Sequence, residues 1–242
     1  MPVDASTAAL TVQPVGFIRS CYREKFGIPR QPGLATSARA RLELSGACNC
    51  LEAVNGLGDF SHIWVQFLFH GTQAEGWRPT VRPPRLGGDK RVGVFATRST
   101  HRPNPLGLSV VKLEGIHQDN GQVWLELSGI DLLDGTPVVD IKPYLPWADS
   151  VTEATSGFAP EPPENHPVLF TDEALEQCRQ YQQQTGHPFQ QLIMELLSQD
   201  PRPAYLKKRS RSDYGVRLWG CNIRWRVTEK GFEVFSIERE DR

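Results

Sequence analysis

The sequence of 242 residues is long enough for one large domain, or for one domain with a smaller second one, and its hydrophobic fraction of 39% supports a substantial core. The longest apolar run, at residues 63–69, is too short to cross a bilayer, and the first residues lack the basic start and apolar stretch of a secretory signal. The five cysteines include Cys48 and Cys50, which stand too close together for an ordinary mutual disulfide. We therefore expect a cytoplasmic protein with free thiols and no membrane partner.

Charge is distributed unevenly, although the formal net charge is only −1. From Trp77 to Gly107 seven Lys and Arg residues stand against one acidic residue, and from Arg202 to Arg226 eight stand against one. Basic segments on an acidic body are the expected footprint of a polyanion ligand, and basic residues scattered over a solvated surface are the alternative. Both segments also carry prolines and aromatic residues, which favours a phosphate-rich ligand.

Short strand patterns dominate the first part of the chain, taken as a domain of residues 1–150. Apolar and polar residues alternate in the segments 15–20, 41–46, 61–69, 91–97, 107–116 and 122–130. The last two segments flank Asn120 and Gly121, a pair typical of a two-residue hairpin turn. Several strands with tight turns and almost no helical periodicity predict an antiparallel barrel or sandwich.

Polar loops stiffened by proline and glycine interrupt these strands at residues 29–33, 77–107 and 131–146. The stretch 71–90 is unusually long for a loop, and long loops in compact domains are usually functional. Within "TRSTHRPNPLG" at residues 97–107, Pro103 and Pro105 exclude a regular helix or a central strand. Asp131, Asp134 and Asp140 could orient amines or hydroxyls or act as bases, but Asp134 precedes Gly135 and is better explained as a turn residue.

Composition changes at residues 151–168, which are rich in proline and acidic residues and which we interpret as a linker. Residues 169–242 then predict a small α+β domain. One helix begins after Thr171 as its N-cap, and a second, at 188–200, carries an apolar stripe suited to core or dimer contact. Three strands follow at 214–220, 222–229 and 231–238. In the loop between helix and strands, Tyr205 could stack on a base beside Arg202, and ordinary packing of Tyr205 is nearly as good an explanation.

Several common catalytic patterns are absent from the sequence. It has no dinucleotide or phosphate-binding glycine fingerprint, no C-x-x-C pair and no G-x-S-x-G elbow. His62 and His70 would share a strand face, but no third ligand is evident, so we expect no metal site.

Three long strings, "GWRPTVRPPRLGG", "GVFATRSTHRPNPLG" and "DLLDGTPVVDIKPYLP", closely resemble the TsaA/TrmO family, also called YaeB. The resemblance extends to the C-terminal strings "QDPRPAY" and "NIRWRVTEKGFEVF". It implies an S-adenosylmethionine-dependent tRNA methyltransferase that modifies the exocyclic nitrogen of threonylcarbamoyl-adenosine, beside the anticodon of threonine tRNA. It also implies an antiparallel β-barrel rather than a Rossmann sheet, and a homodimer.

Carried over by the resemblance, the site residues fall into three groups. The cofactor contacts would be Gln31, Pro32, Gly33, His70, Gly71, Arg98, Leu108, Ser128, Gly129, Ile130 and Asp131. The tRNA contacts, in part suggested by the basic segments, would be Arg85, Arg91, His101, Arg102, Asn104, Lys142, Arg202, Tyr205, Lys207 and Arg224. Asp131 or Asp140 could take the proton of the acceptor nitrogen, directly or through water.

Two departures from the family pattern are visible, His101 in place of an aromatic residue and Leu106 in place of isoleucine. The second is nearly isosteric and changes little. Two other functions remain as alternatives: a non-catalytic RNA-binding adaptor, and a phosphoester hydrolase that uses His62, His70 and His101.

Overall fold

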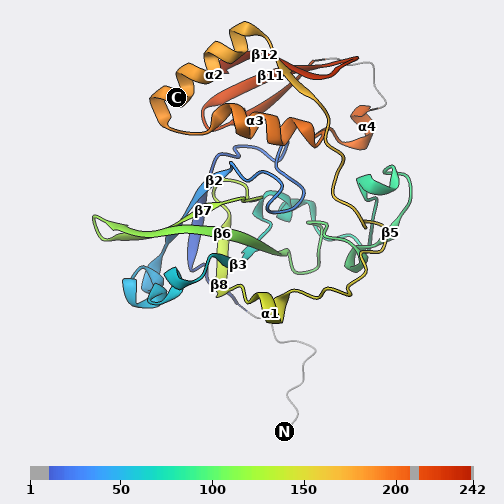
Figure 1. The fold of residues 1–242 in the computed structure, drawn as a ribbon. Helices are drawn as coiled ribbons and strands as arrows, with labels where there is room; N and C mark the ends of the chain where they lie inside the picture. The colour runs from blue at the N-terminus through green and yellow to red at the C-terminus, as the bar shows by residue number, and fades with distance from the viewer. Residues whose placement is uncertain (1–10, 208–212, 241–242) are drawn as a thin grey trace.

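A computed structural model describes residues 11–207 and 213–240 and places them in a β-barrel with a second, helix-covered sheet packed against it (Figure 1). Lys208, Arg209 and Arg211 of the second basic segment lie outside the described residues.

The barrel closes from six strands in the order β1-β2-β7-β6-β3-β8, and each neighbouring pair is antiparallel. Residues alternate between the buried interior and the outer surface, as in β3, where Ile63, Val65 and Phe67 are buried. Gly16 lies where β1 passes close to β2, and a Cβ there would stand 2.4 Å from the Glu43 carbonyl oxygen. The strands are β1 (Gly16–Ser20), β2 (Arg39–Leu44), β3 (His62–Leu68), β6 (Leu106–Asp119), β7 (Gln122–Ser128) and β8 (Pro137–Pro143).

The predicted hairpin is confirmed between β6 and β7. Asn120 and Gly121 both have positive φ, 48° and 79°, as the tight turn that connects right-twisted strands requires. The mainly-β, non-Rossmann fold expected from the alternation and from the family resemblance is therefore confirmed as a closed barrel.

Two expectations for the barrel were wrong. The segment 131–146, interpreted as a loop, contains β8, which completes the barrel between β1 and β3. Its prolines stand at the first and last strand positions, where a missing amide costs least. Conversely, the apolar segment 91–97 forms only β5 (Val92–Gly93), which pairs outside the barrel with β4 (Thr80–Val81), before the chain turns.

Short helical turns fill the connections of the barrel. They are η1 (Gly46–Cys48), η2 (Leu51–Val54), η3 (Leu57–Asp59), η4 (His70–Glu75), η5 (Pro84–Leu86), η6 (Val94–Ala96) and α1 (Pro146–Asp149).

The second sheet has the strand order β10-β11-β12-β9 and carries helices on one face. Thr171 is the predicted N-cap of α2, since its hydroxyl accepts a hydrogen bond from the Ala174 amide. The apolar stripe of α3 is core, because Phe189, Leu192 and Ile193 are fully buried. The short parallel strand β9 and the short helix α4, which lies in a stretch interpreted as a loop, were not expected. The elements are β9 (Val168–Phe170), α2 (Asp172–Thr185), α3 (Phe189–Ser198), α4 (Ala204–Lys207), β10 (Asp213–Leu218), β11 (Cys221–Thr228) and β12 (Gly231–Arg239).

Barrel and second sheet share one hydrophobic core. Tyr22, just past β1, forms an antiparallel bridge with Leu218 of β10, and the Trp219 amide donates to the Cys21 carbonyl at 2.8 Å. All five cysteines are free thiols, as expected. Among the described residues, no helix has both the length and the apolar character that a membrane crossing requires.

Candidate functional site

Three long connections leave the same end of the barrel. Because neighbouring strands are antiparallel, the segments 21–38, 69–105 and 129–136 all lie beyond the ends where β1, β3 and β7 finish. The second sheet and the β4–β5 lobe lie beside this end (Figure 1). The predicted cofactor residues, far apart in the sequence, all come from these connections or from the strand ends next to them.

Two glycines join the first and third of these connections. The Gly33 amide donates to the Gly129 carbonyl at 2.8 Å, and the Gly129 amide donates to the Ala38 carbonyl at 3.1 Å. Both glycines have positive φ, 77° and 68°, which other residues adopt only with strain. A Cβ on Gly129 would already touch the Gly33 Cα at 3.5 Å, whereas a Cβ on Gly33 would meet nothing within 4 Å. The backbone is therefore tightly packed on one side and open on the other.

Arg98 and Asp131 place opposite charges beside this backbone. An Arg98 guanidinium nitrogen donates to the Gln31 side-chain oxygen, and the Ser109 hydroxyl donates to the Asp131 carboxylate at 2.7 Å. Burial raises the pKa of Asp131 from 3.8 to about 6, although the Ser109 hydrogen bond and the nearby Arg98 charge both lower it. Asp131 is thus a carboxylate whose pKa lies close to neutrality, the property expected of a general base.

The remaining predicted cofactor residues surround this pair with unequal roles. Gly71 packs against the Leu133 side chain, and its neighbour His70 begins η4. Leu108 is 52% exposed at the start of β6. Ile130 is fully buried, and the Ser128 hydroxyl donates to Glu114 at 2.6 Å, so these two residues present backbone rather than side chain.

The stretch 97–107 is a rigid support for Arg98. Arg102 donates to the carbonyl oxygens of Thr97 and Val94, at 2.9 and 3.4 Å, and this contact holds the turn that ends at Arg98. His101 contacts the Gly76 carbonyl through Nδ1 at 3.3 Å and lies 3.8 Å from Glu75. At the other end, Gly107 passes so close to the Phe67 ring that a Cβ would stand 2.3 Å from it.

Asp140 has surroundings different from those of Asp131. It lies midway along β8, its side chain is 48% exposed, and its carboxylate accepts from the Ile141 amide at 2.9 Å and lies 3.8 Å from Lys142 Nζ. The three histidines of the hydrolase alternative do not gather either, because His62 and His70 flank opposite ends of β3. No group of three or more His, Cys, Asp or Glu side chains suited to a metal occurs within residues 11–207 and 213–240.

The residues present fit S-adenosylmethionine. The open side of Gly33 leaves room for a ligand against the backbone. The Arg98 guanidinium has the charge to pair with the carboxylate of the cofactor, and the Asp131 carboxylate has the charge to pair with its ammonium or sulfonium group. The elements of the site come from loops around a barrel, without the glycine-rich helix start that a Rossmann sheet would use.

Comparison with known proteins decides the family. Residues 17–150 match the family model of the tRNA-methyltransferase O N-terminal domain, and residues 163–240 match that of the TrmO C-terminal domain. The chain belongs to the TrmO family.

Two bacterial relatives of this TrmO family member are similar to it over nearly their whole length. The tRNA (adenine(37)-N6)-methyltransferase of Escherichia coli is 51% identical over 232 residues, which cover 93% of this chain and 97% of that protein. RcsF of Pseudomonas aeruginosa, named as S-adenosylmethionine-dependent methyltransferase, is 52% identical over 215 residues, 89% of this chain and 91% of that one. The crystal structure of TrmO from the same organism superposes with a TM-score of 0.80 at 43% identity, and covers 98% of this chain and 100% of that chain.

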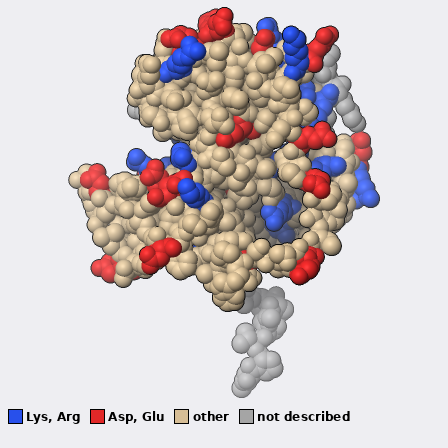
Figure 2. Space-filling view, viewed as in Figure 1, with Lys and Arg blue, Asp and Glu red and all other residues tan. Residues whose placement is uncertain are grey.

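Some of the residues predicted to contact tRNA have exposed side chains, whereas others are already bound to side chains of the protein itself. Arg85, Arg91 and Asn104 are exposed on or beside the β4–β5 lobe, where Trp77 and Phe95 are also 55% and 76% exposed. Arg85 also donates a hydrogen bond to the Glu161 carbonyl. Figure 2 shows Lys and Arg side chains inside a hollow of the surface on the side of this lobe, below the second sheet. Lys142 is exposed on β8, a strand that follows this lobe in the sequence and is not part of it.

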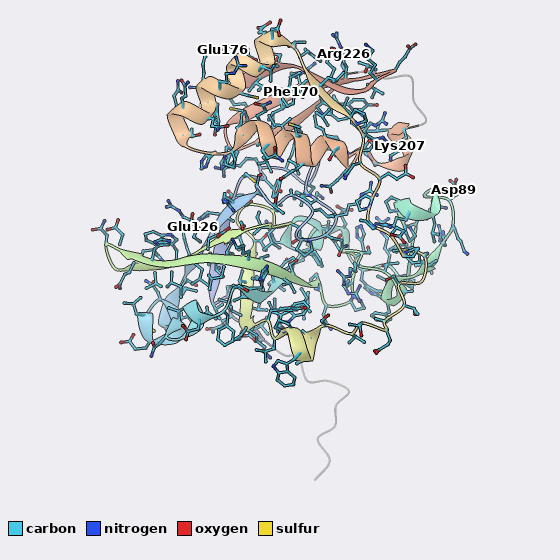
Figure 3. All side chains as sticks on the ribbon, viewed as in Figure 1. Asp89, Glu126, Phe170, Glu176, Lys207 and Arg226 are labelled. Carbon is cyan, nitrogen blue, oxygen red and sulfur yellow. The ribbon has the colours of Figure 1, made fainter. Side chains whose placement is uncertain are left out.

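Arg202, by contrast, is occupied within the TrmO fold. It binds both oxygens of Asp200, at 2.7 and 3.0 Å, and its guanidinium lies over the rings of Tyr214 and Phe232. Burial would raise the pKa of Asp200, but hydrogen bonds from Arg202 and Lys207 outweigh it and hold that pKa at about 2. Figure 3 shows Lys207 on the same side of the view as Asp89 of the lobe. Lys207 also lies 2.8 Å from Asp200, but its side chain is 43% exposed against 14% for Arg202, so Lys207 is the better placed of the two for a phosphate contact.

Two further residues predicted to contact tRNA, Arg224 and Tyr205, lie in β11 and α4. Arg224 is half-buried on β11, and its Nε is buried without a hydrogen-bond partner. Tyr205 belongs to α4, but its side chain lies outside the described part of the chain.

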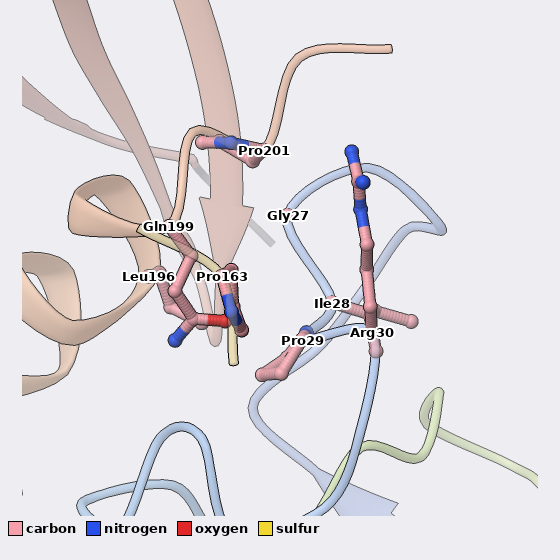
Figure 4. Close-up of a pocket in the computed structure, with 8 residues that line it drawn as sticks. All are labelled: Gly27, Ile28, Pro29, Arg30, Pro163, Leu196, Gln199 and Pro201. Atoms are coloured by element: carbon pink, nitrogen blue, oxygen red, sulfur yellow. The ribbon is translucent and has the colours of Figure 1, made fainter. Parts of the chain in front are cut away.

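Sequence reasoning missed several residues that the TrmO fold brings to the site. Ser109 looks like an ordinary strand serine, yet it holds Asp131. Arg30 directly precedes Gln31 and lines a small pocket with Pro163, Leu196, Gln199 and Pro201 (Figure 4). Partial burial lowers the pKa of Arg30, with Asp200 and Arg85 close enough to act on it as well. Its position beside "QPG" was the available signal, since Arg30 belongs to the same stiff loop.

Proposed function

We propose that this protein transfers a methyl group from S-adenosylmethionine to the exocyclic nitrogen of threonylcarbamoyl-adenosine in threonine tRNA, and that it acts as a homodimer in the cytoplasm. The coarser activity, S-adenosylmethionine-dependent methylation of tRNA at position 37, follows from its place in the TrmO family. The finer statement about the modified adenosine, the tRNA and the dimer is supported by the motif resemblance alone.

For the cofactor site, the observation that carries the proposal is the convergence of Gln31, Arg98, Ser109 and Asp131 at one barrel end. S-adenosylmethionine, when bound, supplies an electrophilic methyl group. We assign the cofactor contacts to Gln31–Gly33, His70, Gly71, Arg98, Leu108 and Ser128–Asp131. Because an in-line displacement depends mostly on positioning, the contribution of these residues is to hold donor and acceptor in reactive geometry.

Asp131 is the residue we assign to the acceptor proton. The acceptor nitrogen is conjugated with a carbonyl and is a poor nucleophile until its proton leaves. A carboxylate with a pKa near 6 is ionised at neutral pH and basic enough to accept that proton, directly or through water. Asp140 keeps a half-exposed setting beside Lys142 and is the weaker candidate.

For tRNA binding we propose a division of labour, in which residues 1–150 bind the cofactor and residues 169–242 help to hold the tRNA, with 151–168 as the linker. Exposed Arg85, Arg91 and Lys207 would contact phosphates, and Trp77 and Phe95 offer rings for unpaired bases. Anticodon-loop bases are single-stranded, so turning one out costs little.

The decisive experiment is nucleoside mass spectrometry. Threonine tRNA that carries threonylcarbamoyl-adenosine but no methyl group is incubated with the protein and S-adenosylmethionine. A gain of one methyl on the modified adenosine is expected, and the same tRNA without the threonylcarbamoyl group should gain none. Methylation of both substrates would overturn the threonylcarbamoyl requirement.

A protein that binds this tRNA but transfers no methyl, with S-adenosylmethionine bound or not, would instead be an RNA-binding adaptor. Binding should also depend steeply on salt, since each phosphate contact adds about 0.7–0.9 to the slope of log affinity against log salt. A flat salt response would contradict the assignment of the basic residues.

A further inference from the structure

Helix α3 of the second sheet contacts the connection 21–38 of the barrel, directly beyond the cofactor residues Gln31–Gly33. In Figure 1, α3 is the helix that faces the barrel, with the early part of the chain beneath it. Four hydrogen bonds from or to α3 and its C-cap reach residues 34–37.

Glu195 makes most of these bonds. Its carboxylate accepts from the Ser37 amide at 2.9 Å, from the Ser37 hydroxyl at 3.1 Å and from the Thr36 hydroxyl at 3.1 Å. Gln199 adds a bond from its side-chain amide to the Leu34 carbonyl at 2.9 Å, and donates to the Glu195 carbonyl at 2.8 Å. Charge-assisted bonds of this kind are stronger than neutral ones, and a carboxylate that accepts three of them fixes the backbone it touches.

The residues held by Glu195 are bonded in turn to the site. The Ala38 amide donates to the Ala35 carbonyl, and the Ala38 carbonyl accepts from the Gly129 amide at 3.1 Å. Gly129 accepts from Gly33 and precedes Asp131 by two residues. Ala35 and Ala38 are fully buried, so this stretch has little freedom to move apart from its neighbours.

We propose that Glu195, supported by Gln199, is a positioning residue for S-adenosylmethionine: through residues 34–38 it holds the Gln31–Gly33 backbone and Gly129 in the arrangement that binds the cofactor. The proposal rests on the assignment of the cofactor to Gln31–Gly33 and Gly129–Asp131. The second sheet thereby contributes to the cofactor site itself, although none of its residues need touch the ligand.

The test compares Glu195→Ala and Glu195→Gln with Glu176→Gln in the full-length protein. Glu176 is an exposed glutamate of the same region that also accepts hydrogen bonds from side chains, and Figure 3 shows it on α2, toward the far side from the barrel. S-adenosylmethionine affinity is measured by calorimetry without tRNA. Steady-state kinetics then give KM for the cofactor and kcat at saturating substrates.

We expect Glu195→Ala to raise both Kd and KM for S-adenosylmethionine at least fivefold, with kcat within twofold of the unaltered protein. Glu195→Gln, which keeps one of the two acceptor oxygens, should fall between, and Glu176→Gln should have no effect. A Ser37→Ala change should add little to Glu195→Ala, because the two groups act as one unit.

A purely structural role would give a lower Tm with unchanged cofactor affinity, and that outcome would overturn the proposal. If Glu195→Ala does not fold, Glu195→Gln decides, because it replaces one of the two acceptor oxygens with an amide donor. Unchanged cofactor affinity in Glu195→Gln would then overturn the proposal equally. Because calorimetry requires no methyl transfer, a protein that binds the cofactor normally but methylates no tRNA would contradict the proposed function and leave this test intact.

Discussion

At the scale of single residues, Asp131 is the group whose environment differs most from that of a surface carboxylate. Its raised pKa means that the fold keeps a carboxylate where burial disfavours charge. The Ser109 hydroxyl and Arg98 compensate only in part. Such a cost is typical of catalytic positions, where residues are selected for chemistry rather than for stability.

Asp131→Asn should therefore stabilise the protein while it strongly lowers turnover. The folded-state pKa of about 6 lies above the ordinary 3.8, so the free energy of unfolding falls as pH rises through this window and then stays low. Asparagine carries no charge and can still accept from Ser109. At pH 7.5 we expect a gain of about 1–3 kcal/mol, measured by urea denaturation. A gain that is equally large at pH 4 would show that charge is not the cause.

The pH dependence of the rate provides a second prediction for Asp131. If it takes the acceptor proton, kcat/KM should fall tenfold per pH unit below about pH 6, where the carboxylate of the free protein is protonated. Asp131→Asn should show a flat profile, lowered by about 10²–10⁴-fold. Asp140→Asn is the matched comparison, and normal turnover in both variants would exclude both residues as the base.

At the scale of elements, the approach of β6 to β3 depends on Gly107. The ring of Phe67 occupies the space that a side chain at 107 would need, and Phe67 packs edge-on against Phe69 with centroids 5.1 Å apart. The final glycine of "TRSTHRPNPLG" therefore has a packing reason rather than a chemical one.

Gly107→Ala should destabilise the protein by about 1–3 kcal/mol, because the buried Phe67 ring must move. Gly93→Ala is the control, since a Cβ there meets nothing within 4 Å and Gly93 has a negative φ of −59°. Chemical denaturation of both variants measures the difference. Equal, small losses would show that the ring moves aside without cost.

Elements with regular alternation were predictable, and those whose pattern is interrupted were not. β3 and β7 alternate throughout, whereas β8 is bounded by Pro137 and Pro143 and β9 has three residues. The strand predicted at residues 91–97 was wrong for another reason. Arg102, five or more residues away, donates hydrogen bonds to the carbonyl oxygens of Val94 and Thr97, which form a helical turn and its end. Such a contact depends on tertiary structure and leaves no local signal.

At the scale of the whole molecule, α3 beside the second sheet contacts the barrel connection that carries part of the candidate site. Arg98 and Asp131 lie in the long motif strings, and Gln31 lies in the stiff loop 29–33, so all three could be found from the sequence with the family resemblance. Glu195 could not, since a glutamate on a helix looks like any solvated residue until the barrel connection lies against it. Arg202 shows the converse, because a basic residue in a basic segment proves to be occupied by Asp200.

The continuous core predicts that barrel and second sheet unfold together. Ellipticity at 222 nm reports mainly α2 and α3, whereas tryptophan fluorescence reports the barrel through Trp64 and Trp124 and the second sheet through Trp219 and Trp225. Both signals should follow one transition in urea, with coincident midpoints. Two separated midpoints would show that the bridge between Tyr22 and Leu218 does not couple the two sheets.

The connection 21–38 belongs to the barrel by its place in the chain and to the second sheet by its contacts. A boundary drawn in the linker at residues 151–168 therefore does not separate two exchangeable modules. Chimeras between relatives that exchange everything after the linker would pair a foreign α3 and β10 with a native connection. A chimera should fold and bind the cofactor only when residues 21–38 are exchanged together with the C-terminal part. The sequence of this connection, rather than that of the linker, then decides whether the two parts of a chimera are compatible.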